Sequence, residues 1–341
     1  MAIDGYSIAI VIPAFQAELC IASVLNKVPS FVDWIIIVDD NSKDNTKLIV
    51  KKYSDQRIIL LNHEKNLGVG GAMVTGFRKA LDLKADLISK IDADGQMDPY
   101  YLDRFARVCI LYNCDYVKAN RFGHISALPA MPKIRLAGNL LLTFLTKFVS
   151  GYWNIFDPQN GYFMITRKML KRLNLARIDE SYFFENSMLI NLNILKAKIG
   201  EIYLPANYGN EVSSMKLRKI FFSFPQKLMS GYCYRVFQKY IFRSLSPYAL
   251  LLFFGIASTV WGIIWGGITW YKSFETDIPA ATGSIILALL PLILGWTSLL
   301  QALVIDMQDA GSSLLFDYDD ETLKSISVEY PSPIINHQKK Q

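Results

Sequence analysis

The chain has few of the residues that carry disulfide or zinc chemistry. Its 341 residues include four cysteines and three histidines. No two cysteines have the Cys-x-x-Cys spacing of a metal or redox site, and the histidines form no His-x-x-x-His pair. A disulfide-stabilised secreted domain and a histidine-based zinc site are therefore excluded, and we expect the cysteines to be thiols in a reducing compartment.

A signal peptide is not expected either. Ser7–Ile12 is apolar, but no basic region precedes it and Pro13 follows at once. The net charge of +6 is modest, so the placement of the charges is more informative than their sum. Hydrophobic residues make up 52% of the chain, the mean hydropathy is +0.22, and the excess is concentrated after Pro247.

Acidic residues are absent between Lys216 and Arg243, where seven basic residues alternate with aromatic ones. This composition is typical of helices that lie on an anionic membrane surface, and nucleic-acid binding is the competing interpretation. Two runs without a charged residue follow, Pro247–Trp270 (24 residues) and Ala280–Ile305 (26 residues). Each exceeds the ~20 residues that span a bilayer. They favour two transmembrane helices over a soluble helical hairpin, and a lipid bilayer over nucleic acid as the partner.

The charges around these runs predict the topology. The connecting segment Lys272–Pro279 has one lysine and two acids, whereas seven basic residues precede the first run. The positive-inside rule therefore puts residues 1–246, and after two spans also the C-terminus, on the cytoplasmic side of the inner (plasma) membrane. Glycines within Gly255–Gly267 suit packing against other copies of the chain, so we expect a homo-oligomer.

Up to residue 119 the chain alternates apolar strands with amphipathic helices. Beyond it the pattern is less regular, with a turn cluster at Asp157–Gly161. The alternation predicts an α/β domain with a doubly wound, mostly parallel sheet. The predicted strands are Tyr6–Ile12, Trp34–Val38, Arg57–Leu61, Asp86–Ile91, Asp115–Ala119, Tyr162–Thr166 and Ile199–Leu204, and the predicted helices include Glu18–Val28, Thr46–Tyr53, 66–83, Leu136–Val149 and Glu185–Lys196.

Two acidic turns follow predicted strands, Asp39-Asp40 and Asp92-Ala93-Asp94. Two carboxylates spaced i, i+2 can bind one Mg²⁺ or Mn²⁺, which prefer oxygen ligands and keep places for substrate phosphates. A solvated turn is the alternative for any single Asp-x-Asp. However, sheets of this class bind ligands at the carboxyl ends of their strands. Both turns and Pro13 are expected at that edge.

Four segments, in their order along the chain, resemble family 2 glycosyltransferases: Ile10–Glu18, Val38–Thr46, Asn66–Ala72 and Asp92–Gln96. The resemblance covers roughly residues 6–210 and is closest to the polyprenyl-phosphate branch. That branch includes dolichyl-phosphate mannose synthases and bacterial undecaprenyl-phosphate glucosyltransferases with two C-terminal transmembrane helices. It implies a glycosyltransferase A-type fold.

The resemblance also implies an activity. This is the inverting, metal-dependent transfer of a hexose from a nucleoside-diphosphate sugar to polyprenyl (undecaprenyl) phosphate at the cytoplasmic membrane face, as in modification of lipopolysaccharide or other cell-envelope glycans. UDP-glucose is the expected donor, and GDP-mannose, UDP-galactose and UDP-4-amino-arabinose stay open. The expected parts are a catalytic domain (1–212), basic amphipathic interface helices (213–246), two transmembrane helices (247–305) and an acidic, partly disordered tail (306–341).

Two other functions are alternatives to this one. A processive polysaccharide synthase is disfavoured because the chain has no Gln-x-x-Arg-Trp sequence and two spans are too few for a polymer channel. A membrane-anchored nucleotide-binding scaffold would keep the nucleotide site without catalysis. It would release no nucleoside diphosphate when a metal and an acceptor are added.

For the donor site, the resemblance implies Asp94 as the main metal ligand, with Asp92 and Gln96 in or beside its coordination shell. Phe15 can equally serve packing, Asp44 can be only a helix cap, and Gly70 can belong to a structural turn before a helix. The residues implied to bind the nucleotide sugar are Pro13, Phe15, Glu18, Asp39, Asp40, Gly70 and Asp92.

For the acceptor site, Arg121 and Arg135 occupy positions comparable to the arginines that bind the lipid phosphate in that branch, and arginine suits bidentate phosphate recognition. Arg218 is a further candidate, with anchoring to anionic lipid as the alternative. Asp157 begins a segment that resembles an Asp-x-x-Ser-Gly-Phe motif, with Asn160 in place of serine. Analogy makes Asp157 the general base. However, a phosphate monoester with a second pKa of ~6 hardly needs one, so orienting the acceptor or stabilising charge on the sugar is the other role.

Overall fold

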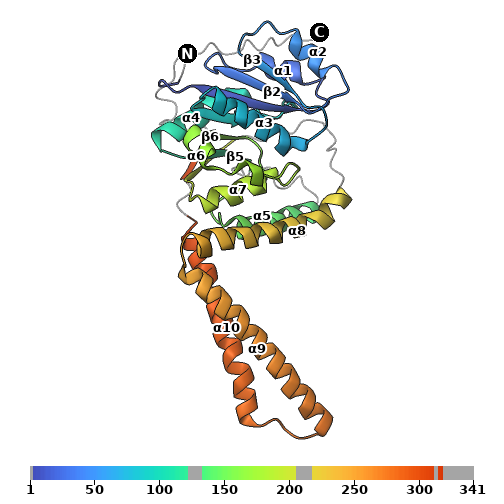
Figure 1. Ribbon diagram of the computed structural model, residues 1–341, viewed down its shortest axis with the longest axis vertical. Coiled ribbons are helices and arrows are strands. Elements are labelled where there is room, and N and C mark those ends of the chain that lie inside the picture. The colour runs from blue at the N-terminus through green and yellow to red at the C-terminus, as the bar shows by residue number, and fades with distance from the viewer. Residues whose placement is uncertain (1–2, 122–132, 205–216, 311–313, 318–341) are drawn as a thin grey trace.

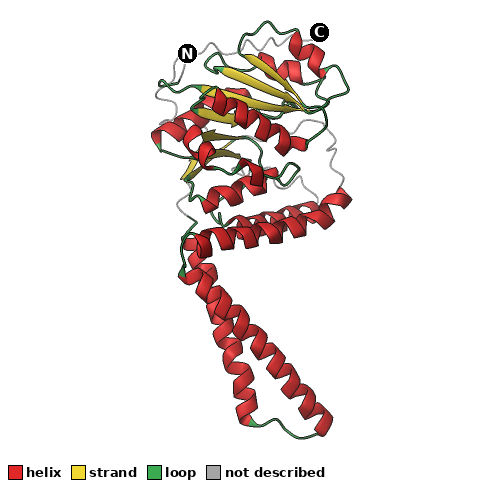
Figure 2. Cartoon of the chain, viewed as in Figure 1, coloured by secondary structure: helices red, strands yellow, loops and turns green. Residues whose placement is uncertain are grey.

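A mixed eight-stranded β-sheet forms the centre of the N-terminal domain (Figures 1 and 2). The computed structural model describes residues 3–121, 133–204, 217–310 and 314–317. Among the described strands, β6 is antiparallel to its neighbours β4 and β5, and the other pairs are parallel. The predicted doubly wound, mostly parallel α/β sheet is confirmed. Its order is β3-β2-β1-β4-β6-β5-β7-β8, with β1 (Ile8–Ala14), β2 (Trp34–Asp39), β3 (Ile58–Asn62), β4 (Leu87–Lys90), β5 (Tyr116–Asn120), β6 (Phe163–Thr166), β7 (Ile199–Tyr203) and β8 (Leu314–Asp317).

Helices cover both faces of this sheet and then continue beyond it (Figure 2). Short 3₁₀ turns lie at Pro99–Tyr101 and Leu175–Arg177, and a π-helical segment at Phe237–Phe242. The helices are α1 (Ile21–Asn26), α2 (Thr46–Lys51), α3 (Gly68–Asp82), α4 (Leu102–Leu111), α5 (Lys133–Ser150), α6 (Arg167–Arg172), α7 (Phe184–Ile194), α8 (Leu217–Val236), α9 (Pro247–Thr276) and α10 (Thr282–Gln308).

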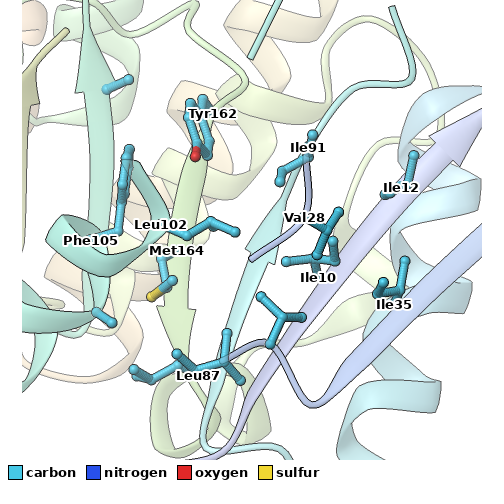
Figure 3. Close-up of a cluster of buried hydrophobic side chains, with 14 of the residues drawn as sticks. Ile10, Ile12, Val28, Ile35, Leu87, Ile91, Leu102, Phe105, Tyr162 and Met164 are labelled. Atoms are coloured by element: carbon cyan, nitrogen blue, oxygen red, sulfur yellow. The ribbon is translucent and has the colours of Figure 1, made fainter. Parts of the chain in front are cut away.

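Strand β1 explains why the sequence has continuous apolar runs instead of alternation. Successive side chains of a strand point to opposite faces, and both faces of this sheet are covered, as is usual for parallel strands. Ile10 and Ile12 pack with α1 and α4 on one face (Figure 3). Ala9 and Val11 pack with α3 and α7 on the other face. Because helices cover both faces of the sheet, a ligand can reach its strands only at their polar ends.

Helices α9 and α10 form a hairpin that projects from the domain (Figure 1). Both are long and apolar enough to cross a membrane, and large apolar side chains such as Phe253 are 78% exposed. The prediction of two spans agrees with the length and composition of these helices.

The glycines of the hairpin serve contacts within one chain. A Cβ at Gly255 would lie 2.8 Å from Leu299, and a Cβ at Gly262 would lie 2.8 Å from the carbonyl oxygen of Ala288. Small residues allow this close approach of two helices. The predicted homo-oligomer therefore gains no support from these two positions and stays a prediction.

After α10 the chain returns to the sheet. Helix α10 continues to Gln308, and Leu314–Asp317 forms strand β8, which pairs in parallel with β7. The expected tail at 306–341 therefore begins inside a helix and contributes a strand that the sequence did not predict. Because β8 joins the sheet of the N-terminal domain, both ends of the hairpin lie on the side of this domain.

A buried polar cluster connects the hairpin to the domain. Asp306 of α10 is 2% exposed and accepts hydrogen bonds from Arg235 Nη1 (2.6 Å) and Nη2 (3.0 Å). Tyr240 Oη (2.6 Å) and Trp153 Nε1 (3.2 Å) donate to the same carboxylate. Four donors from α8, the π-helical segment and the chain after α5 thus converge on the end of α10.

This cluster corrects the interpretation of the basic segment. Lys227 pairs with Asp179 (2.6 Å), Arg235 is fully buried, and Lys239 pairs with Asp309 (2.8 Å). Three of the seven basic residues expected on a lipid surface therefore form ion pairs with acidic residues of the same chain, and two of the three, Arg235 and Lys239, are buried. The sequence gives the charges of a helix but not the acids that fold back onto it from other elements.

We expect Asp306→Asn to destabilise the protein, because it leaves the Arg235 guanidinium buried without a counter-charge. Breaking a buried pair from one side typically costs ~3–5 kcal/mol. Thermal unfolding of the purified protein in detergent measures the effect. Asp277→Asn is the matched control, since Asp277 lies at the exposed hairpin end with φ 54°, which asparagine tolerates. Equal melting temperatures for the two variants would contradict the assignment.

Candidate active site

Three polar segments meet at one edge of the sheet. Asp39 ends β2 and Asp40 follows it, and Asp92-Ala93-Asp94 follows β4, at the carboxyl ends of parallel strands. The segment Asp157–Gly161 precedes β6, and β6 runs in the opposite direction. The start of β6 therefore lies at the edge where β4 ends, and the structure brings these three predicted segments together.

Asp40 holds the loop that begins α3. Its carboxylate accepts hydrogen bonds from the backbone N–H groups of Leu67 and Gly68, both at 2.8 Å, and lies 2.7 Å from His63 Nδ1. The other ring nitrogen of His63 is 2.9 Å from Thr75 Oγ1. The observed contacts of Asp40 are structural, and nucleotide binding by Asp40 stays a prediction.

Asp39 has unused hydrogen-bonding capacity. It is fully buried, and its Oδ2 accepts from the Ser42 N–H (3.1 Å) and pairs with Lys47 (3.2 Å). Its Oδ1 is buried and has no hydrogen-bond partner among the described residues. Such an acceptor is costly unless a ligand or water satisfies it. Asp39 is therefore the more suitable of the two aspartates for a nucleotide hydroxyl.

The first loop, Pro13–Glu18, is locked against the loop after β2. The Gln16 N–H donates to Ser42 Oγ (3.0 Å), the Glu18 N–H donates to Asp44 Oδ2 (3.1 Å), and Glu18 Oε2 accepts from the Asn45 N–H (3.0 Å).

Asp44 also accepts from the N–H and hydroxyl of Thr46 at the start of α2, which agrees with the helix-cap interpretation. Burial alone would raise the pKa of Asp44, but these bonds outweigh it and lower the pKa. The first loop leaves Phe15 50% exposed, so packing does not account for its ring.

The glycines in the first turn of α3 are explained by packing. Gly68 has φ +81°, a left-handed conformation that favours glycine. A Cβ at Gly68 would lie 2.5 Å from the carbonyl oxygen of Glu180, and a Cβ at Gly70 would overlap the carbonyl oxygen of Asp179. The structure supports the structural alternative at both positions, and sugar-nucleotide contact by Gly70 stays a prediction.

The Asp-x-Asp turn is partly exposed, and its side chains are held by a hydrogen bond within the turn and by the buried Lys90. Gly95 has φ +78°, and Asp94 Oδ1 accepts from the Gln96 N–H (2.9 Å). Asp92 Oδ1 lies 2.9 Å from Nζ of Lys90, a residue 2% exposed on β4. Burial opposes the charge of Lys90, but Asp92 and Glu185 outweigh it and raise the pKa of Lys90.

These residues offer two carboxylates and an amide, all hard oxygen donors suited to Mg²⁺ or Mn²⁺. The described part of the chain holds no cluster of three or more acidic, histidine or cysteine side chains that could complete a metal site. A cation at this turn would therefore depend on substrate or water oxygens for its remaining ligands.

Asp157 and Arg121, predicted separately, form one ion pair. Asp157 is 1% exposed and accepts from Arg121 Nε (2.7 Å), Arg121 Nη2 (3.0 Å) and the Arg121 N–H (3.2 Å). Asn160 Nδ2 donates to it at 3.3 Å. The Arg121 side chain is 40% exposed. Both oxygens of the Asp157 carboxylate are therefore occupied by hydrogen bonds, whereas the Arg121 side chain beside it is partly exposed.

Two further charged groups support this pair and were missed from the sequence. Glu201 of β7 accepts from the backbone N–H groups of Phe156 (3.0 Å) and Asp157 (3.3 Å), and burial raises its pKa. Lys118 of β5 is 1% exposed, and burial lowers its pKa to about 8, although Asp157, Glu201 and Glu185 act against this shift. A lysine and a glutamate inside apolar strands were the available signal.

Arg135 and Arg218 lie in the first turns of α5 and α8. Their side chains fall outside the described part of the structure, so their assignment to the lipid phosphate stays a prediction.

Comparison with known proteins identifies relatives of the chain. The family model described as Glycosyl transferase family 2 matches residues 9–173. A UDP-N-acetylglucosamine–dolichyl-phosphate N-acetylglucosaminyltransferase of Methanococcus voltae is 33% identical over 216 residues, which are 59% of this chain and 86% of that protein. A dolichyl-phosphate beta-glucosyltransferase of Trichomonas vaginalis is 26% identical over 225 residues, 61% of this chain and 65% of that protein. The solved structure of glucosyl-3-phosphoglycerate synthase of Mycobacterium tuberculosis superposes with a TM-score of 0.49 and 19% sequence identity. The match covers 68% of this chain and 80% of the synthase chain.

The buried Lys118 predicts a pH-dependent stability. Its folded-state pKa of about 8 lies below the ordinary 10.5, so the unfolded chain binds more protons between these values. The free energy of unfolding then rises with pH across that window. We expect the free energy of unfolding of Lys118→Met to lack this rise. The unfolding free energy of the wild type minus that of the variant should therefore increase from pH 8 to pH 10.5.

Denaturant unfolding at several pH values measures that difference. Lys171→Met, at an exposed position of α6, is the control and should leave the difference near zero at every pH. A difference for Lys118→Met that does not vary with pH would contradict the prediction.

Proposed function

The chain belongs to glycosyltransferase family 2, and from this premise we propose that it transfers a hexose, with inversion, from a nucleoside-diphosphate sugar to polyprenyl phosphate at a membrane surface. One juxtaposition carries the proposal. The Asp92-Ala93-Asp94 turn and the Arg121–Asp157 pair share a sheet edge. The same chain continues into two helices long enough to span a bilayer.

On the donor side, Asp94, Asp92 and Gln96 are the proposed ligands of Mg²⁺ or Mn²⁺. When bound, the cation neutralises charge on the leaving nucleoside diphosphate. The unsatisfied Oδ1 of Asp39 supports a nucleotide hydroxyl as its partner. Pro13, Phe15, Glu18 and Asp40 form or brace the surrounding loops.

On the acceptor side, the proposed phosphate ligand is Arg121, and Asp157 orients it. Both oxygens of Asp157 are already hydrogen-bonded to Arg121. A phosphate monoester is largely dianionic above its second pKa of ~6 and needs no base to remove a proton. This favours the orienting role over general-base catalysis. Arg135 and Arg218 are proposed as further contacts to the lipid phosphate.

The names of the two relatives support the proposed acceptor, polyprenyl phosphate, more than they support the proposed donor sugar. Both are named for a dolichyl phosphate acceptor, whereas one is named for N-acetylglucosamine and the other for glucose. We keep UDP-glucose as the proposed donor and place UDP-N-acetylglucosamine beside it as the competing one. GDP-mannose is the third candidate.

Exposed apolar side chains on and after helices α5 and α8 support the proposed placement at the membrane. Helices α5 and α8 lie side by side between the sheet and the hairpin (Figure 1). Large apolar side chains on or after them are exposed, among them Phe144 (55%), Met229 (64%) and Phe242 (73%). We propose that this face rests on the cytoplasmic leaflet, which brings the sheet edge near a lipid phosphate.

The direct test incubates the purified protein with polyprenyl phosphate, Mg²⁺ or Mn²⁺ and a panel of labelled UDP- and GDP-sugars. We expect label in the organic phase with one UDP-hexose or UDP-N-acetylhexosamine. EDTA should abolish it, and Asp94→Ala should reduce the rate by about 100-fold or more. Asp82→Ala, at an exposed position of α3, is the control and should retain activity. Absence of lipid-linked label with every donor would refute the proposal.

The pH profile of kcat/KM separates the two roles of Asp157. If the dianionic phosphate is the nucleophile, activity rises through a pH of ~6 in the wild type, and Asp157→Asn keeps this limb at a lower rate. Because the variant weakens the hold on Arg121, we also expect a higher KM for polyprenyl phosphate and little change in the KM for the donor. Loss of the acidic limb in Asp157→Asn would instead identify Asp157 as the base.

A further inference from the structure

A buried lysine lies directly beneath the Asp-x-Asp turn. Lys90 is the last residue of β4 and is 2% exposed. Its Nζ is 2.9 Å from Oδ1 and 3.2 Å from Oδ2 of Asp92. It is also 3.3 Å from Oε1 of Glu185, in the first turn of α7. One ammonium group therefore contacts both a proposed metal ligand and a carboxylate of another element.

The surroundings keep this ammonium group in place. A Cβ at Gly161 would overlap Lys90 Nζ and would lie 3.2 Å from Glu185 Oε1. Gly161 belongs to the segment that begins at Asp157, so its missing side chain makes the space in which Lys90 lies between two acids. The glycine thus links the acceptor segment to the Asp-x-Asp turn.

The two carboxylates are not equivalent. The side chain of Asp92 is 29% exposed at the sheet edge, where a substrate can reach it, whereas the side chain of Glu185 is 16% exposed. A divalent cation that binds Asp92 would meet the ammonium group of Lys90 as a like charge nearby. Glu185 offers that group a partner on the other side, already within contact distance.

We propose that Lys90 is a positioning residue and a built-in counter-cation for Asp92. Its ammonium group balances the charge of the Asp92 carboxylate and orients it before a divalent cation binds. When the cation binds Asp92, the ammonium group leaves Asp92 and keeps Glu185 as its partner. The Lys90–Glu185 pair thereby sets the affinity of the metal site and keeps it moderate. The inference rests on the proposed metal-dependent transfer.

Opposite effects of two substitutions follow from this arrangement. Lys90→Met removes the positive charge beside Asp92, so a divalent cation should bind more tightly. Glu185→Gln is isosteric and removes the competing partner of Lys90, so the full charge of the lysine acts on Asp92 and the cation should bind more weakly. A role of Lys90 in folding alone would weaken binding in both variants or in neither.

The experiment measures Mn²⁺ binding directly, by the electron paramagnetic resonance signal of free Mn²⁺, with the full chain in detergent and without donor or acceptor. We expect the dissociation constant to fall by about 3- to 10-fold in Lys90→Met and to rise by a similar factor in Glu185→Gln. Lys171→Met should leave it unchanged. Thermal unfolding of each variant verifies that the protein is folded, and Glu185→Gln tests the inference alone if Lys90→Met does not fold.

The outcomes distinguish this inference from the proposed function. Asp94→Ala should abolish the measured Mn²⁺ binding. If it does not, the proposed metal site itself is wrong. If Asp94→Ala abolishes binding but Lys90→Met and Glu185→Gln leave the constant unchanged, or shift it in the same direction, only the role of Lys90 is overturned. We further expect Lys90→Met to lower kcat despite tighter metal binding, because Asp92 loses its orienting partner.

Discussion

The reversed direction of strand β6 is the constraint on which the site depends. Its register pairs Phe163 with Lys90 on one side and with Lys118 on the other. The chain therefore enters β6 at the edge where β4 and β5 end. In a parallel strand the segment Asp157–Gly161 would begin at the opposite edge, away from Asp92. The direction of this one strand brings the residues proposed to bind the donor and the acceptor together.

Buried charge is the second feature that organises the molecule. Arg235 is fully buried against Asp306 at the junction with the hairpin, and Lys90 is buried against Asp92 and Glu185 beneath the site. A buried ion is strongly destabilised when its counter-charge is removed. At the junction the result is a fixed attachment of α10 to the domain. Beneath the site it is an acidic turn whose charge is already balanced.

The strongly patterned parts of the fold could be predicted from the sequence, and the non-local parts could not. Strand β2, predicted at Trp34–Val38, is observed at Trp34–Asp39, because apolar runs bounded by turn residues are local signals. Strand β8 has only four residues, and its partner β7 lies more than a hundred positions earlier in the sequence. No local sequence pattern therefore predicts it. Lys118 and Glu201 were missed although each stands within an apolar strand. A sequence shows a charged residue but not the oppositely charged or polar residue that stabilises it in the interior. That residue usually belongs to another helix or strand.

We propose that a divalent cation binds at the end of β4, between a nucleoside diphosphate and the residues proposed for the acceptor. The most direct measurement is a structure of the protein with Mn²⁺ and uridine diphosphate, with the metal located by its anomalous scattering. We expect one peak in contact with Asp94 and the diphosphate, on the Arg121 side of the sheet edge. A nucleotide bound elsewhere, or bound at this edge with the metal remote from Asp94, would contradict it.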